Sequence, residues 1–477
     1  MSRRTAPLLA ACAALLATVL STPKAQAAPL FQSDNVQQLG TLPDSAGAIG
    51  ARFSPDGGTM YVTSATGLGI YDIAEPAAPR LLSRLALPHF ENEDVDVGRV
   101  GGRDLVIITN DPSFTTVGAL YVIDVTNPRL PVLLSVTPTQ VPTAAADPLV
   151  GSPGSRNGHI ANCIQGCRYL WTTGSDEGLT VYDLSDPASP AYLGALAVPG
   201  GGFTHDVAVD PSGIGWVTGE DGTFGYDTAT ITDPLRPRLV YRSDEAVTNT
   251  GNSGPSLDPG SANGSPLDFL HHNSLRTGLS ISDGARPTVR RRAGRAGNVL
   301  AVTEEDYLRP GCNGQGSLQT WQITGEANSD GTRKLKLLDL WTTELNELME
   351  LEGRSNPDGL PTTVNCSAHW FDEDRGLIAQ GWYDQGVRFL DVSDPRDIKQ
   401  VGYFVTEGEY WAAYFAPSDP AREIVYGLDV AGGIDVIRID RPNARTRVRA
   451  PDRELRRESA NRPHPVFGYA CVLPQAT

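Results

Sequence analysis

The chain has 477 residues and a formal net charge of −17, with 40% hydrophobic and 20% charged residues. This length allows two or three ordinary domains or one large repeat domain, and the apolar content is sufficient to bury a core. The negative charge repels phosphate backbones and anionic lipid surfaces, so neither nucleic acid nor a membrane surface is an expected partner.

The first 27 residues are predicted to be a secretory signal peptide. Arg3 and Arg4 precede an Ala/Leu-rich run that is too short to span a bilayer and that ends in AQA, a small-x-small cleavage signal. The mature chain is expected to begin near Ala28 and to be secreted. Cys12 lies in a stretch that resembles a lipoprotein box, but it comes too early to follow a full apolar region. No later segment is apolar enough for membrane insertion.

An internal repeat occupies most of the remaining chain. Each copy has an alternating strand, an Asp, a short turn with Pro and a second alternating strand. Asp can accept hydrogen bonds within its own turn, and Pro cannot continue the strand. Each copy follows another hairpin, so one unit has four strands, which predicts a β-propeller. The clearest copies are residues 68–88, 119–137, 178–199, 222–243 and 386–404.

The fold class is predicted to be all-β, a seven-bladed β-propeller of four-stranded blades over residues 28–440. The last unit lacks a fourth strand, and NVQQLGTLP (35–43) resembles the fourth strand of the other units. If this N-terminal strand pairs with the last unit, it closes the ring and removes an exposed sheet edge. Residues 441–477 form a basic tail that is expected to be loosely ordered. The predicted units are 47–88, 90–140, 157–199, 203–245, 268–341, 363–405 and 408–440.

Two of the repeat copies resemble a known family. GLTVYDLSDPASP (178–190) and GVRFLDVSDPRDI (386–398) are similar to the LVIVD repeat of secreted and surface-associated bacterial β-propellers. Other stretches, among them LHHNSL and VTEEDY, resemble the long secreted members seen in actinobacteria. The resemblance implies a propeller and no particular activity. A more distant, architectural similarity is to the selenium-binding and methanethiol oxidase propellers, which use histidines at the blade tops for metal.

Histidines begin four consecutive predicted units. The first strand of a propeller blade lines the central channel, so these side chains are expected at one end of that channel. Neighbouring strand residues face opposite ways, so only one of His271 and His272 can face the channel. The shared H-[DN] pattern with His205 selects His272, whereas aligning Phe203 with Phe269 would select His271. The unit-opening histidines are His159, His205, His271, His272 and His369.

Carboxylates on the returning strands are expected at the same rim. A metal site there would use His159, His205, His272 and His369, with Glu304 or Asp306 as the carboxylate, and would suit zinc, copper, iron or manganese. Two other interpretations remain open at this point: the rim side chains hydrogen-bond one another, or they form a metal-free mouth for a polar ligand. The rim acids are Asp176, Glu177, Glu220, Asp221, Glu304, Glu305, Asp306 and Asp384.

Five cysteines remain after the signal peptide, and export implies an oxidising compartment. Cys163 and Cys167 flank a short turn and are predicted to form a disulfide, as are Cys312 and Cys366 in adjacent units. The odd number leaves at least one cysteine without an intramolecular disulfide partner.

The first functional hypothesis is a secreted binding or scaffold propeller. It would act through its loop face and its His- and acid-lined channel mouth on a protein or a small polar ligand. The alternative is a metal-dependent enzyme, such as an oxidoreductase, that uses the histidine rim. The sequence contains no nucleophile elbow, P-loop or dinucleotide fingerprint.

Overall fold

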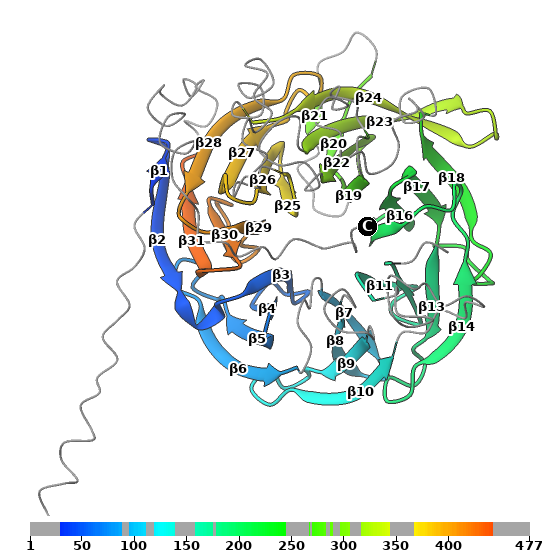
Figure 1. The fold of residues 1–477 in the computed structure, drawn as a ribbon, viewed down its shortest axis with the longest axis horizontal. Helices are drawn as coiled ribbons and strands as arrows, with labels where there is room; N and C mark the ends of the chain where they lie inside the picture. The colour runs from blue at the N-terminus through cyan, green and yellow to red at the C-terminus, as the bar shows by residue number, and fades with distance from the viewer. Residues whose placement is uncertain are drawn as a thin grey trace, which may run out of the picture.

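In a computed structural model of the protein, the first strand of most sheets lies near a common centre (Figure 1). The predicted signal peptide, the basic tail, Asp306 and the cysteines Cys312 and Cys366 lie outside the described residues. In the described part of the chain, no helix is long and apolar enough to cross a membrane. The structure describes residues 29–87, 95–110, 119–138, 158–174, 178–244, 267, 270–282, 287–289, 296–305, 316–343 and 367–441.

The predicted all-β class is confirmed, since the described elements are strands apart from one short 3-10 helix, η1 (Pro43–Ser45). The first three sheets each contain four consecutive antiparallel strands. Their strands are β3 (Ala48–Phe53), β4 (Thr59–Ser64), β5 (Gly67–Asp72) and β6 (Arg80–Ala86); β7 (Val95–Val100), β8 (Arg103–Asn110), β9 (Ala119–Asp124) and β10 (Val132–Pro138); and β11 (Ala161–Ile164), β12 (Tyr169–Thr172), β13 (Leu179–Asp183) and β14 (Ala191–Leu196).

The next two groups of four strands form one eight-stranded sheet. Their outer strands, β18 and β24, pair in parallel, with Tyr241 opposite Arg333. A separate two-stranded hairpin joins β20 (Leu279–Ser280) to β21 (Thr288–Val289). The eight strands are β15 (Thr204–Val209), β16 (Ile214–Gly219), β17 (Gly222–Asp227), β18 (Arg238–Ser243), β19 (Leu270–Arg276), β22 (Val299–Glu305), β23 (Ser317–Ala327) and β24 (Arg333–Trp341).

The two ends of the described chain meet in the last two sheets. β1 (Phe31–Gln32) adds a fifth strand beside β28, and β2 (Val36–Leu42) pairs with β31 so that Val36 lies opposite Ile439. The N-terminal strand is therefore the outermost strand of a sheet built from the end of the chain. The remaining strands are β25 (Phe371–Asp374), β26 (Leu377–Gly381), β27 (Val387–Asp391), β28 (Lys399–Val405), β29 (Tyr410–Phe415), β30 (Ile424–Asp429) and β31 (Gly433–Ile439).

The repeated Asp ends the third strand of a sheet and organises the turn that follows. The Oδ1 atoms of Asp72, Asp183 and Asp391 accept hydrogen bonds of 2.7–3.0 Å from the backbone N–H two residues later. Asp124 does the same, at 2.9 Å. The prediction that Asp closes its own turn is confirmed. The backbone hydrogen bond from Ala74 lowers the pKa of Asp72, and hydrogen bonds from the Ser185 side chain and backbone lower that of Asp183, because they favour the ionised form.

The cores lie between neighbouring sheets. For example, Leu105 and Ile107 of β8 pack with Leu170 and Tyr182 of the following sheet. The largest of these side chains are fully buried and serve packing. They include Trp171, Trp216, Trp321, Trp382 and Trp411.

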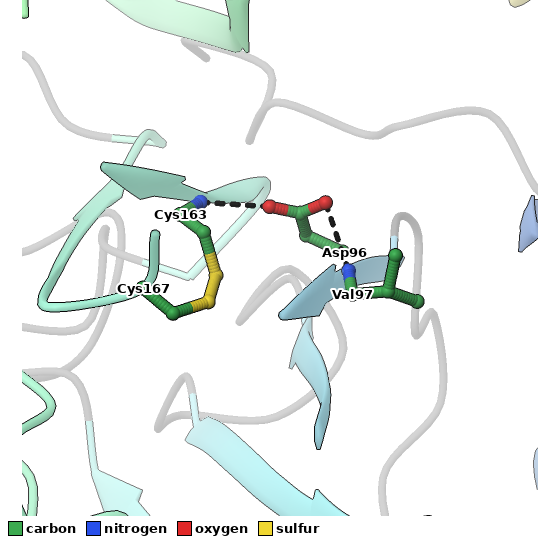
Figure 2. The surroundings of a disulfide bond; sticks show 4 residues. All are labelled: Asp96, Val97, Cys163 and Cys167. Atoms are coloured by element: carbon green, nitrogen blue, oxygen red, sulfur yellow. Dashed lines mark hydrogen bonds between the residues drawn. A yellow bond between two sulfur atoms is a disulfide. The ribbon is translucent and has the colours of Figure 1, made fainter. Parts of the chain in front are cut away.

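Cys163 and Cys167 lie at disulfide-bonding distance, with their Cα atoms 4.4 Å apart (Figure 2). The pair joins the end of β11 to its turn. Asp96 of β7 holds this segment against the preceding sheet, because its Oδ2 accepts a 2.7 Å hydrogen bond from the Cys163 N–H. Gly98 packs directly beside the two sulfur atoms. The contact between the second and third sheets therefore requires a residue without a side chain at position 98.

We expect Gly98→Ala to destabilise the fold by about 1–3 kcal/mol, because the new methyl group would overlap the Cys167 sulfur and lie 3.0 Å from that of Cys163. Gly325→Ala on β23 is the matched control, since a methyl group there would meet no atom within 4 Å. Denaturant unfolding measures both. Equal stability of the two variants would contradict this account of the contact.

Partly buried carboxyl groups also join the last two sheets, those of β25 and β29. Asp372 of β25 accepts a 3.1 Å hydrogen bond from the Phe415 N–H of β29. The next residue, Glu373, accepts hydrogen bonds from the Gly376 and Gly278 N–H groups at 2.6 and 3.4 Å. Burial outweighs these bonds and raises the pKa of Asp372 to about 6 and that of Glu373 to about 7.

A raised pKa in the folded state adds stability at low pH, and this stability is lost as pH rises through the folded-state pKa. Glu373→Gln removes the ionisation. The free energy of unfolding of the variant, relative to that of wild type, should therefore rise by about 1–3 kcal/mol from about pH 5 to about pH 8. Unfolding free energies at both pH values measure this difference. Glu326→Gln, at an exposed position of β23, is the control and should show no such gain.

Candidate metal centre

Four histidines lie in or just before the first strands of successive groups of strands around the centre. His205 lies in β15 and His272 in β19, whereas His159 and His369 each lie two residues before a first strand, β11 and β25. All four residues are at most 1% exposed. We call His159, His205, His272 and His369 the histidine cluster.

The four rings form a continuous row. The ring centroids of His159 and His205 are 4.1 Å apart, as are those of His205 and His272, and the step from His272 to His369 is 4.0 Å. The Nε2 atoms of His159 and His205 approach to 2.7 Å. Two imidazole nitrogens that bind one zinc ion lie roughly 3 Å apart, so this spacing suits two ligands of a shared ion.

Hydrogen bonds at Nδ1 determine which ring nitrogen carries the proton. The Nδ1 atoms of His205 and His369 bond to backbone carbonyl oxygens of the next group of strands, those of His272 and Trp411, at 3.0 and 2.7 Å. A carbonyl oxygen can only accept, so Nδ1 is the donor and Nε2 keeps its lone pair. His272 Nδ1 lies 3.1 Å from the Asn273 side-chain oxygen, which has the same effect. Neutral imidazoles in this tautomer are competent metal ligands.

For three of the histidines, a threonine of the preceding group of strands holds the backbone. The hydroxyl groups of Thr109, Thr173 and Thr218 donate to the carbonyl oxygens of His159, His205 and His272 respectively, at 2.9, 2.5 and 2.7 Å. Each of these threonines lies in the second strand of its sheet or directly follows it. The histidine positions therefore depend on contacts between sheets.

Glu305, the last residue of β22, places a carboxylate against three of the imidazoles. Its Oε2 lies 3.8 Å from His205 Nε2 and 3.9 Å from His272 Nε2, and its Oε1 lies 3.9 Å from His369 Nε2. One ligand atom from each of His205, His272 and Glu305 can be chosen so that all three lie within 4.8 Å of one another. His272 Nε2 is buried and has no hydrogen-bond partner among the described residues.

Tyr383 orients this carboxylate. Its hydroxyl donates to Glu305 Oε1, and its ring lies 5.0 Å from that of His369. The backbone of Tyr383 has φ = 35°, in the left-handed region that bulky residues rarely adopt. Such a conformation persists only where the surrounding structure enforces it, and it occurs preferentially at functional sites.

Burial keeps the central imidazoles neutral. It lowers the pKa of His205 and of His272 well below 6.5, and the neighbouring histidines lower both further, because a charge on one ring disfavours a charge on the next. Glu305, which is 0% exposed, therefore faces neutral rings. A buried carboxylate is costly without a compensating cation, and a divalent ion between the Nε2 atoms would supply one.

His271 and His272 are neighbours in one strand, and Glu304 and Glu305 are neighbours in the strand paired with it, so the two members of each pair face opposite sides. His272 joins the cluster, as the H-[DN] pattern predicts, whereas His271 lies opposite Glu304 in the strand pair and bonds through Nδ1 to the Thr223 hydroxyl at 2.8 Å. Glu304 accepts a 3.0 Å hydrogen bond from Ser317. Among the described residues the carboxylate near the imidazoles is Glu305. Of the two predicted carboxylates, Glu304 faces the other side, because adjacent strand residues face opposite sides, and Asp306 lies outside the described residues.

Other predicted rim acids bond to the backbone near the cluster. Glu220 and Asp221 accept hydrogen bonds of 3.1 and 2.7 Å from the N–H groups of Phe203 and Gly202, just before His205. Asp384 directly follows Tyr383, and Asp176 and Glu177 lie outside the described residues.

No sequence pattern indicated Tyr383. Glu305 could have been found by pairing β19 with β22 in the register that His272 requires.

Comparison with known proteins gives one family match. A model of the LVIVD repeat matches residues 168–197, which span β12 to β14. This match supports the family resemblance of the repeat, and it covers one of the predicted units. No curated protein matches the chain.

We expect His205 and His369 to be protonated at Nδ1 and not at Nε2 in the metal-free protein at pH 7, because only Nδ1 faces a carbonyl oxygen. Long-range proton–nitrogen spectra of histidine-labelled protein distinguish the two tautomers, and His205→Gln and His369→Gln variants assign the signals. A proton on Nε2 of either residue would contradict the donor assignment.

Proposed function

We propose that the protein is a secreted, seven-bladed LVIVD-repeat propeller that binds a transition-metal ion at one end of its central channel. Four-stranded sheets together with the LVIVD repeat fit a repeat-based binding or scaffold module. The proposal counts seven blades because seven first strands, β3, β7, β11, β15, β19, β25 and β29, each begin a group of strands. It divides the eight-stranded sheet at the parallel β18–β24 pair, and β2 completes the last blade and closes the ring.

Secretion is supported by the predicted signal peptide and by the cysteine pair, which suits an oxidising compartment. In that setting the loop face and the channel mouth are the surfaces offered to a protein or a small polar ligand.

The observation that carries the metal proposal is the buried group of His205, His272 and Glu305. His159 and His369 complete the proposed ligand set, since each contacts a member of this group through its own Nε2 atom. Neutral imidazoles and one carboxylate suit zinc, copper, iron or manganese. The ligands come from four successive groups of strands, two of which share the eight-stranded sheet, so the ion would also stabilise the contacts between those groups.

A metal-dependent enzyme, such as an oxidoreductase, is the second candidate. The left-handed Tyr383 beside Glu305 favours it, because conformational strain of this kind is concentrated at active sites. Bound metal would supply Lewis-acid or redox chemistry, whereas Tyr383 would hold the carboxylate in place. Oxygen uptake by metal-loaded protein that is absent in His272→Ala would favour this candidate over a binding role.

The test is metal content after incubation with zinc, copper, iron or manganese, followed by removal of free ions. We expect wild type to retain about one ion per chain, and His272→Ala to bind at least about 10-fold more weakly, because it removes a central ligand. His271→Ala is the matched control: the same residue type is lost one position away, and it bonds to Thr223 instead.

His271→Ala should keep the metal and should lose about 1–3 kcal/mol of stability, because the Thr223 hydroxyl loses its partner. Wild-type protein that stays metal-free with all four ions would refute the metal site. Equal metal loss in both variants would instead show that His272 is not a specific ligand.

A further inference from the structure

A cavity of about 550 Å³ lies on the central channel beside the histidine cluster. Three of its lining residues, Asp206, Asn273 and Trp370, each directly follow a histidine of the cluster. At its other end the lining includes Arg99, whose side chain is 69% exposed. The cavity therefore extends from the layer next to the histidines towards solvent, and its volume is in the range of small-molecule sites.

Two buried asparagines offer hydrogen-bonding groups to this cavity. Asn162 of β11 is 7% exposed, and within the described ranges its side-chain amide makes no hydrogen bond. Asn273 of β19 is 3% exposed, and its Oδ1 is occupied by His272 Nδ1 and the Thr303 hydroxyl. That arrangement leaves the Asn273 NH₂ group as the part available to a ligand. Both amides can therefore hydrogen-bond to a molecule bound in the cavity.

Two arginines and two aspartates line the cavity, so their formal charges cancel. Arg52 and Arg99 are opposed by Asp96 and Asp206. Arg99 is also engaged outside, 3.4 Å from Asp104, and Asp96 accepts the Cys163 N–H. A fixed net charge would select an ion of opposite sign, whereas this lining favours a neutral ligand.

Aromatic rings form one wall. Trp370, just before β25, and Phe371, its first residue, are 3% and 4% exposed and line the cavity. The Trp370 ring is held by the cluster, with its centroid 5.0 Å from that of His272. A rigid aromatic surface beside amide groups can pack against the C–H face of a ring whose edge carries hydroxyl groups.

We propose that this cavity binds a small neutral polyhydroxylated molecule, a cyclic polyol or a monosaccharide. A hydroxyl group both donates and accepts, so it can satisfy the Asn162 amide and the Asn273 NH₂ group together. The aromatic wall takes the apolar face of the ring, and the balanced charges neither attract nor repel a neutral molecule. This binding does not require the metal ion proposed above.

The test is titration calorimetry of the full chain with myo-inositol and with D-glucose, compared with the charged analogues gluconate and glucosamine. We expect a neutral probe to bind more tightly than both charged analogues. Asn162→Leu should weaken that binding about 3- to 10-fold, the effect of losing a hydrogen bond to a neutral group. Asn127→Leu, at an exposed turn position away from the cavity, should leave it unchanged.

Thermal unfolding verifies that Asn162→Leu is folded, and Asn162→Ala replaces it if it is not. Absence of binding by both neutral probes, tighter binding of a charged analogue, or equal binding by Asn162→Leu and wild type would overturn the proposal. The titrations are repeated on wild-type protein from which bound metal has been removed with a chelator. Retained binding by the metal-free protein supports the cavity site whatever the outcome for the metal, whereas binding that disappears with the metal would assign the probe to the ion and overturn the proposal.

Discussion

The arrangement at the centre depends on hydrogen bonds that cross from one sheet to the next along the inner strands. Threonine hydroxyls of one sheet donate to the carbonyl oxygens of the histidines that begin the next, as Thr173 does for His205. The imidazole Nδ1 of His205 in turn donates to the His272 carbonyl oxygen in the following group of four strands. His205 is thus held by the group of strands before it and by the group after it. A rotation of either group would break one of these bonds.

This constraint has a chemical consequence. Because Nδ1 is used to hold the fold, Nε2 is the nitrogen left for the centre, and burial keeps the rings neutral. The same hydrogen bonds that position the sheets therefore prepare the imidazoles as ligands. Glu305 adds the negative charge that neutral rings lack, and Tyr383, in a strained backbone conformation, directs that carboxylate.

The centre and the cavity beside it differ in the kind of ligand that they suit. The histidine cluster combines neutral nitrogen donors with a buried carboxylate and so suits a cation. The cavity has balanced charges, an amide without a described partner at Asn162 and an aromatic wall, and so suits a neutral molecule. Asn273 links the two, since its side-chain oxygen faces His272 while its NH₂ group is left for the cavity.

The sequence by itself determined the strands, because alternation, the Asp-capped turns and their repetition are local signals. It also indicated that histidines open successive units, and the H-[DN] pattern selected His272 over His271. Only the tertiary structure decided which atoms meet. The choice of Glu305 over Glu304 depends on the register between β19 and β22, and the placement of Tyr383 depends on contact between sheets far apart in the chain. A one-residue change of register turns every side chain to the opposite face, and no local pattern specifies that register.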